Sequence, residues 1–184
     1  MTFSVYEHFG FKNISIALST RPEKRVGNEE LWDKSENILK DVLTESVESF
    51  TIQDGEGAFY GPKIEFSLTD SLDRVWQCGT IQLDFSMPSA LTASYVDEND
   101  NKLVPVMIHR AILGSIERFI GILIEHYGGN LPFWLSPKQI IIANIADKHV
   151  EFAKKIKKVL AENDFRCSLD LRNEKIGYKI RELI

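Results

Sequence analysis

The loop Gly57–Pro62 leads into an expected strand and brings two reactive side chain types to its entrance. The phenol of Tyr60 and the ammonium of Lys63 lie three residues apart there. They could serve a binding site together. A lysine at this position could equally be a solvated residue on the edge of a sheet, and the sequence leaves both interpretations open.

A long strand expected over residues 75–85 carries a second group of candidate residues. Uncharged hydrogen-bonding side chains at every second position suit a sheet floor that binds a small polar ligand, because buried amides need partners. A solvent-facing sheet surface is the alternative. Strict alternation puts Gln77 on the face opposite Gln82, so one site could use both only if the strand contained a bulge or a strong twist. The residues expected on one face are Cys78, Thr80, Gln82 and Asp84.

The third candidate region runs from His109 to Arg118, from a strand end through a glycine-containing turn into a helix. The first turn of that helix carries Ser115 and Arg118. An arginine is unfavourable in the field of a helix N-terminus, and a bound phosphate or purine ring would offset its charge. His109 could be either an imidazole satisfied within the core or a metal ligand.

Periodicity predicts the elements that position these residues. Alternating patterns predict strands over 13–18, 63–69, 75–85 and 104–108, with 63–69 and 75–85 forming an antiparallel pair. One helical pattern begins at Asn28, which is a good N-cap. A second helical pattern covers about 115–127, and Gly128 can end that helix in a left-handed conformation. The apolar stripe predicted for the first helix is Leu31, Ser35, Ile38, Leu39, Val42 and Leu43, and that for the second is Ile116, Phe119, Ile120, Leu123 and Ile124.

After the linker Pro132–Pro137 the pattern changes to strand, helix, strand and helix. The predicted ranges are 139–145, 148–163, 165–171 and 174–184. This spacing favours a parallel α/β sheet. The fold class predicted for the whole chain is therefore α+β followed by α/β, with domains over 1–133 and 134–184. Because the second unit is short and ends in an apolar helical pattern, we expect the sequence to be cut short.

Composition narrows the class of protein. The 184 residues are 43% hydrophobic and 27% charged, as in a chain that forms a core. A net charge of −5 excludes a globally basic nucleic-acid coat, so a polyanion would have to meet local basic clusters. No apolar run approaches the roughly 20 residues that span a bilayer. Two cysteines far apart in the sequence favour a reducing compartment.

Several of these stretches together resemble threonyl-tRNA synthetases, a family of class II aminoacyl-tRNA synthetases. They are STRPEKR at 19–25, GEGAFYGPK at 55–63, QCGTIQLDF at 77–85 and HRAILGSIER at 109–118, and LRNEKIGYKIR at 171–181 is similar to the first half of the family's anticodon-binding domain. The resemblance covers essentially the whole chain. It implies a partial class II antiparallel sheet with helices, followed by a truncated mixed-sheet anticodon-binding domain.

The resemblance also implies a reaction and roles for individual residues. ATP, with Mg²⁺, would activate threonine to threonyl-adenylate, and the acyl group would pass to tRNA(Thr). A Zn²⁺ ion would bind the amino and hydroxyl groups of threonine and so reject valine, which a pocket of the right size alone cannot do. The implied residues are Lys63 and Arg118 for catalysis; Tyr60, Gln77, Cys78, Gln82, Ser115 and Arg118 for threonine and ATP; His109 for zinc; and Arg172, Asn173 and Lys175 for tRNA.

The sequence also departs from the family pattern. The first and second class II signatures and two further zinc ligands are not found, and one histidine cannot build a zinc site. We therefore expect a fragment that is inactive alone and is completed in a longer, cytoplasmic, homodimeric chain with no membrane segment. The alternative is a non-catalytic synthetase-like module that binds a nucleotide or tRNA.

Overall fold

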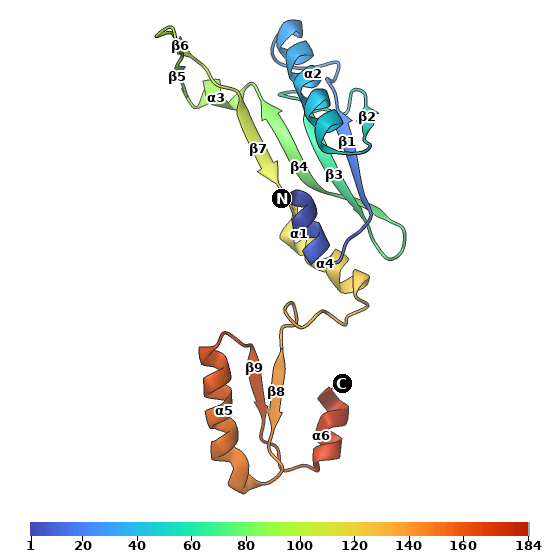
Figure 1. Ribbon diagram of the computed structural model, residues 1–184, viewed down its shortest axis with the longest axis vertical. Coiled ribbons are helices and arrows are strands. Elements are labelled where there is room, and N and C mark those ends of the chain that lie inside the picture. The colour runs from blue at the N-terminus through green and yellow to red at the C-terminus, as the bar shows by residue number, and fades with distance from the viewer. Residues whose placement is uncertain (184) are drawn as a thin grey trace. The chain divides into compact units, whose positions relative to one another are not determined.

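The computed structural model describes residues 1–183 and divides the chain into two compact units, with the boundary in the sequence between His126 and Tyr127. The first unit is built on a five-stranded sheet with the strand order β2-β1-β3-β4-β7 (Figure 1). β1 and β2 are parallel and all other neighbours are antiparallel, which confirms the predicted antiparallel pair β3–β4. The strands are β1 Ile14–Ser19, β2 Thr51–Gln53, β3 Lys63–Thr69, β4 Val75–Asp84 and β7 Met107–Ala111.

Four helices and a small hairpin complete the first unit. The helices are α1 Thr2–His8, α2 Glu29–Ser46, α3 Met87–Ala90 and α4 Ile116–His126, and the hairpin strands are β5 Tyr95–Val96 and β6 Lys102–Leu103. Asn28 caps α2 as predicted, because its side chain accepts a hydrogen bond from the Leu31 amide at 2.9 Å. Gly128 has a φ of +56°, which confirms the left-handed residue predicted after α4.

Helices α1, α2 and α4 all pack on one face of this sheet. Phe3 of α1 packs edge-on against Phe66 of β3, with ring centroids 5.9 Å apart. Trp32 of α2 is fully buried and packs against Phe85, at the end of β4. Phe119 of α4 is buried and contacts Phe9 and Phe11, the aromatic residues that follow α1 in the sequence. The side chains of the opposite face are therefore not covered by these three helices.

A β-bulge in β4 decides which side chains share a face. Gly79 pairs with Phe66 and Gln77 pairs with Ser67, so Cys78 is an extra residue without a partner on β3. The bulge shifts the alternation by one residue, and Gln77 lies on the same face as Gln82. Strict alternation gave the opposite result for Gln77, and that prediction is wrong.

The second unit has a parallel pair of strands, β8 and β9, flanked by two helices (Figure 1). This confirms the parallel strand–helix–strand arrangement predicted from the spacing. Its elements are β8 Ile140–Ala143, the 3₁₀ turn η1 Asp147–His149, α5 Val150–Glu162, β9 Cys167–Asp170 and α6 Ile176–Leu183. The last residue of the predicted final helix, Ile184, lies outside the described residues.

Three expectations about the first unit need correction. The predicted helix stripes include residues that are about half exposed, namely Ile38, Val42, Ile116, Ile120 and Ile124, whereas the buried Trp32 and Ile122 were not in them. The strand predicted over 104–108 is wrong by three residues, because β7 begins at Met107 after Pro105. The sequence pattern also missed the short elements α1 and β2.

Candidate functional site

One row of polar side chains crosses all five strands of the sheet. Cross-strand pairing aligns Gln53, Ser19, Lys63, Gln82 and His109, one from each strand in order. Paired residues point to the same face, so these five side chains, here called the polar row, lie on the face opposite the helices. The sheet thus presents a hydrogen-bonding floor rather than a hydrophobic one.

The neighbouring row confirms this division of the two faces. It consists of Ile52, Leu18, Ile64, Ile81 and Arg110, and is apolar except at its last strand. Leu18 and Ile64 are buried in the core. The apolar row stabilises the fold, whereas the polar row, apart from the fully buried Ser19, is available to a ligand.

Lys63 and Gln82 lie side by side at the centre of the polar row. Lys63 forms an ion pair with Glu65, whose side chain is buried on the same face. The Tyr60 hydroxyl donates a hydrogen bond to Oε1 of Gln82 at 3.3 Å. The structure therefore brings together three of the predicted residues: Tyr60, Lys63 and Gln82.

His109 ends the polar row on the edge strand β7, and a buried carboxylate holds its ring. Nε2 of His109 lies 2.8 Å from Oδ2 of Asp84, which is only 3% exposed. Oδ1 of Asp84 accepts hydrogen bonds from the amides of Ser86 and Met87. Burial raises the pKa of Asp84, but these amides and His109 outweigh burial and lower the pKa to about 2.

Arg118 lies against the bulge of β4, at the N-terminal end of α4. Its guanidinium donates a hydrogen bond to the Gln77 carbonyl at 2.6 Å. That carbonyl is accessible because β7 pairs only with residues 80–84 of β4. Ser115 precedes the helix, accepts a hydrogen bond from the Arg118 amide and donates one to Glu117. Arg118 also lines a cavity of about 250 Å³ with Arg74, Trp76, Gly121, Ile122 and Glu125.

Cys78, the bulged residue, is 4% exposed. Burial raises the pKa of its thiol, and the positive charge of Arg118 only partly opposes that shift. A buried thiol with a raised pKa is a poor nucleophile, so its side chain supports the site through packing. Its position in the bulge also brings Gln77 onto the polar face.

Main-chain hydrogen bonds join the two loops that lie next to the polar row in the sequence, after Ser19 and before Lys63. The Gly57 amide donates to the Thr20 carbonyl at 2.7 Å, and the Val26 amide donates to the Phe59 carbonyl at 2.8 Å. The Tyr60 carbonyl in turn accepts from the Phe85 amide at 2.8 Å. These bonds connect loop 20–28 and loop 54–62 to the end of β4, and so fix Tyr60 beside Gln82.

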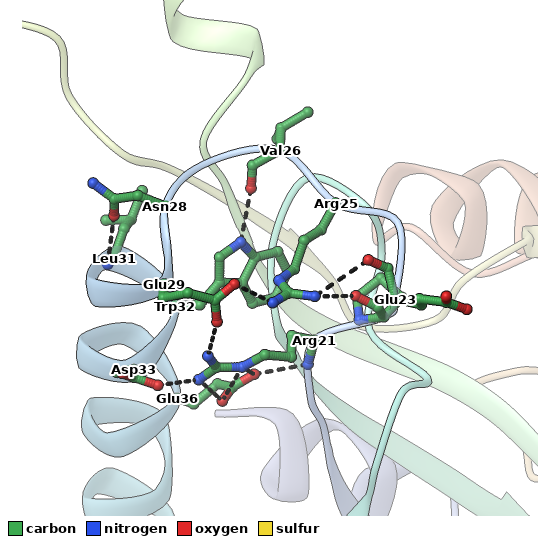
Figure 2. A network of polar contacts seen from close by, with 11 residues as sticks. Arg21, Glu23, Arg25, Val26, Asn28, Glu29, Leu31, Trp32, Asp33 and Glu36 are labelled. Carbon is green, nitrogen blue, oxygen red and sulfur yellow. Dashed lines mark hydrogen bonds and ion pairs between the residues drawn. The ribbon is translucent and has the colours of Figure 1, made fainter.

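Loop 20–28 is also held against α2 by arginine side chains (Figure 2). Arg21 contacts Glu29, Asp33 and Glu36, which lie along one face of α2. The hydrogen bonds that the guanidinium donates to these carboxylates, to Glu36 above all, raise the pKa of Arg21 above its already high ordinary value. Arg25 bonds to Glu29 and to the carbonyls of Pro22 and Glu23. Both arginines therefore have a structural role, because their guanidinium groups are paired with residues of α2 and of the loop itself.

In the second unit, Arg172, Asn173 and Lys175 lie between β9 and α6 and are exposed. Arg172 forms ion pairs with Asp170 and Glu182, and its hydrogen bonds lower the pKa of Asp170 to about 2. Within residues 1–183 the side chains of Asn173 and Lys175 have no hydrogen-bond or ion-pair partner. They are therefore the two members of this group that are free to bind a ligand.

Sequence reasoning missed residues that support the site. Glu65 and Asp84 each hold a candidate residue, and Ser19 and Gln53 extend the polar row, joined by a 3.1 Å hydrogen bond. A Lys-x-Glu spacing on a strand could have indicated the Lys63–Glu65 pair, since both side chains face the same way. No local signal could have indicated Ser19 and Gln53, because the register of β1 and β2 aligns them.

Within residues 1–183, no group of three or more His, Cys, Asp or Glu side chains is arranged to hold a metal ion. Among the helices that the structure describes, none is long and apolar enough to cross a bilayer.

Comparison with known families identifies both units. Residues 1–127 match the tRNA synthetase class II core domain (G, H, P, S and T), and residues 139–183 match an anticodon binding domain. Because the first match covers well over half of the sequence, the chain belongs to the class II tRNA synthetase core-domain family. The predicted fold class is thereby confirmed.

Individual relatives carry the similarity further. The chain is 59% identical over 182 residues to the threonine–tRNA ligase of Dichelobacter nodosus and 58% identical to that of Halorhodospira halophila. Both alignments cover 99% of this chain and 28% of the relative. A crystal structure of the RNA binding domain of threonyl-tRNA synthetase from Cryptosporidium parvum Iowa II has a TM-score of 0.91 and 45% identity, over 99% of this chain and 46% of the other. The resemblance to threonyl-tRNA synthetases is confirmed.

Proposed function

We propose that this chain supplies part of the adenylate-forming site and part of the anticodon-binding domain of a threonine–tRNA ligase. The polar row is the observation that carries the proposal. It places Lys63, Gln82 and His109, which the family resemblance implicates, side by side on the one sheet face that no described helix covers. The 59% identity to a threonine–tRNA ligase supports the same substrate.

The chemistry of activation needs groups that hold threonine and ATP in line and neutralise phosphate charge. Lys63 offers an ammonium next to Gln82, and Arg118 offers a guanidinium at the N-terminus of α4, where an anion is favoured. The side chains of Tyr60, Gln77, Gln82 and Ser115 would provide hydrogen bonds that orient the bound groups. Mg²⁺ would accompany ATP. Arg118 would exchange its bond to the Gln77 carbonyl for contact with the nucleotide.

His109 fits the role of one zinc ligand. A ligating histidine usually donates its second ring N–H to a carboxylate, and Asp84 provides such a carboxylate at 2.8 Å. One histidine alone falls short of the three protein ligands of an open zinc site, so the remaining ligands must come from elsewhere in a longer chain. Bound zinc would coordinate the amino and hydroxyl groups of threonine and thereby discriminate against valine.

The second unit would read the anticodon of tRNA(Thr). Asn173 and Lys175 are exposed between β9 and α6, where an amide can read a base edge and an ammonium can contact a phosphate. Arg172 would add positive charge while it remains paired with Asp170. We propose a domain boundary at 133/134, in the proline-containing linker where the sequence pattern changes. We also propose a homodimeric longer protein, as the family resemblance implies, and a cytoplasmic location, in line with the widely spaced cysteines.

A chimera tests the proposal directly. The 182 matching residues of the Dichelobacter nodosus ligase would be replaced by those of this chain. We expect the chimera to catalyse threonine-dependent exchange of pyrophosphate into ATP. Arg118→Ala should lower that exchange about 100-fold or more, as the loss of a group that stabilises developing charge does.

Arg110→Ala is the matched control, because Arg110 belongs to the apolar row and lies on the opposite face of the sheet. It should leave the exchange rate within about twofold of the unmodified chimera. A folded chimera that exchanges no pyrophosphate, while retaining affinity for ATP or tRNA, would overturn the proposal in favour of a non-catalytic binding module.

A further inference from the structure

Asp84 is a buried carboxylate whose two oxygens have different partners. Oδ1 accepts three hydrogen bonds, from the Ser86 amide at 2.8 Å, the Met87 amide at 2.9 Å and the Ser86 hydroxyl at 3.1 Å. Among residues 1–183, Oδ2 faces only Nε2 of His109, at 2.8 Å. The turn after β4 thus fixes the carboxylate, and the fixed carboxylate presents one oxygen to the imidazole.

This arrangement determines which ring nitrogen of His109 carries the proton. A carboxylate that accepts two amides is ionised at neutral pH and can only accept hydrogen bonds. Nε2 of His109 must therefore be the donor, and in the neutral imidazole Nδ1 keeps its lone pair. Within the part of the chain that the structure describes, Nδ1 has no hydrogen-bond partner, and the side chain is 41% exposed.

We infer that Asp84 is a positioning residue, whose carboxylate holds His109 in the Nε2–H tautomer and keeps Nδ1 free to bind a divalent metal ion. The metal-binding part of this inference rests on the proposed function, whereas the tautomer does not. Asp84 acts through His109 and touches no substrate.

Strand register explains why the pair is rigid. His109 pairs with Gln82, and Met107 pairs with Asp84, so the two side chains are diagonal neighbours on adjacent strands. Both belong to the polar face of the sheet. The separation of the ring and the carboxylate therefore depends on backbone hydrogen bonds of the ladder and not on a flexible loop.

Nitrogen-15 NMR of the histidine rings tests the tautomer in this chain without any metal. In the unmodified chain at a pH where the ring is neutral, we expect Nε2 of His109 to be protonated and Nδ1 to be unprotonated. In Asp84→Asn, the side-chain amide should keep its oxygen on the turn amides and turn its NH₂ group toward Nε2. The proton should then move to Nδ1, as happens when a carboxylate partner of histidine becomes an amide.

Asp70→Asn is the matched control. Asp70 directly follows β3 and, like Asp84, is buried and accepts two turn amides, here from Leu72 and Arg74. It faces Arg74 and Trp76 instead of a histidine. Its substitution should leave the His109 tautomer unchanged. A proton on Nδ1 in the unmodified chain would overturn the inference, and so would an Asp84→Asn variant that keeps the Nε2–H form. The first of these two results stands even if the variant fails to fold.

The chimeric ligase tests the consequence for metal binding. Competition for Zn²⁺ with a chromophoric chelator should show affinity lowered about 10- to 100-fold by Asp84→Asn and unchanged by Asp70→Asn. Equal affinities would overturn the metal-binding part of the inference. If the tautomer is as expected but the chimera exchanges no pyrophosphate, the proposed ligase function fails while the positioning role of Asp84 stands.

Discussion

The two units hold the ends of their strands by different means. In the first unit, loops 20–28 and 54–62 lie on the end of β4 through main-chain hydrogen bonds and close approaches at glycine. In the second unit, the ends of the parallel strands β8 and β9 are joined by the side chain of Lys179. Its buried ammonium donates to the carbonyl and Oδ1 of Asn144 and to the Asp170 carbonyl, at 2.9–3.2 Å.

The difference shows where each unit can place functional side chains. In the first unit, main-chain hydrogen bonds hold the loops, so side chains of the polar row keep hydrogen-bonding capacity for a ligand. In the second unit, the side chain of Lys179 joins the strand ends, so Lys179, Asn144 and Asp170 are buried and bonded to one another. Exposed neighbours such as Asn173 remain free to bind a ligand. The proposed catalytic groups accordingly belong to the first unit.

Gly61→Ala should have the largest effect on stability. A Cβ atom at Gly61 would lie 1.9 Å from the Leu83 carbonyl oxygen, and a backbone atom cannot move aside as a side chain can. We expect the free energy of unfolding of the first unit to fall by about 3 kcal/mol or more. Urea unfolding followed by segment-resolved hydrogen exchange would measure it. A loss below 1 kcal/mol would show that main-chain contact at this loop matters little.

Lys179→Met should be the largest single effect in the second unit. It keeps the length of the side chain but removes the donor that serves the carbonyl and Oδ1 of Asn144, whereas the Asp170 carbonyl keeps the Asn144 amide. We expect a loss of about 2–3 kcal/mol. Hydrogen exchange in residues 140–143 and 167–170 reports it. Lys175→Met, an equal change at an exposed lysine, is the control. Similar exchange in the two variants would refute the role assigned to the buried ammonium.

Arg21→Gln probes a place where the first unit depends on a side chain for loop position. The substitution removes the guanidinium that joins loop 20–28 to three carboxylates of α2 (Figure 2). We expect the unfolding free energy to fall by about 1–2 kcal/mol, because Glu29 and Asp33 are largely exposed and contribute little. Chemical denaturation monitors the loss. A change as large as that of Gly61→Ala would blur the distinction between the units.

Acid should weaken the second unit through Asp170. Hydrogen bonds from Arg172, opposed by burial, lower the pKa of Asp170 from an ordinary 3.8 to about 2. Because the folded pKa is the lower one, the carboxylate contributes its full stability above about pH 4 and loses it as the pH falls toward 2. Asp170→Asn should make the acid dependence of unfolding shallower over that range. Parallel acid dependences for the two proteins would contradict this assignment.

Gly177→Ala should give the smallest effect, and in the opposite direction. A Cβ atom at Gly177 meets nothing within 4 Å, and the residue lies in the first turn of α6. Alanine should raise the stability of the second unit by about 0.5 kcal/mol, by restricting the unfolded chain. Thermal unfolding would detect a small rise in Tm. Destabilisation would mean that this helix end is more crowded than the structure indicates.

Local patterns predicted the long elements and failed where distant pairing decides. Strands β3 and β4 follow from alternation, and the cap at Asn28 follows from residue type, because each depends on neighbours in sequence. The stripe of α2 was predicted with Ile38 and Val42 inside because the pattern cannot tell how wide the underlying sheet is. Helix α1 is short, and its aromatic residues become buried only through contacts with β3 and α4.

The residues of the candidate site also fall into two groups, those that local motifs identify and those that only strand pairing brings together. Motifs identified Tyr60, Lys63, Gln82, His109 and Arg118, and whether these act as proposed stays a prediction. The supporting residues could not be identified, because Asp84 meets His109 only through the register of β4 and β7. Ser19 and Gln53 join the polar row through pairing between β1 and β2, which lie on either side of helix α2 in the sequence.

The extra residue at Cys78 makes strand length, and not only strand composition, a constraint on this sheet. Removing Cys78 would restore regular pairing with β3, because Gly79 and Gln77 already lie opposite the adjacent residues Phe66 and Ser67. Trp76 and Gln77 would keep their present faces, and only the local bend of β4 would be lost. Removing one residue from 79–84 instead would turn every side chain between the gap and the bulge to the other face. Homologous sequences should therefore tolerate a one-residue gap at the bulge far better than one in the regularly paired part of the strand.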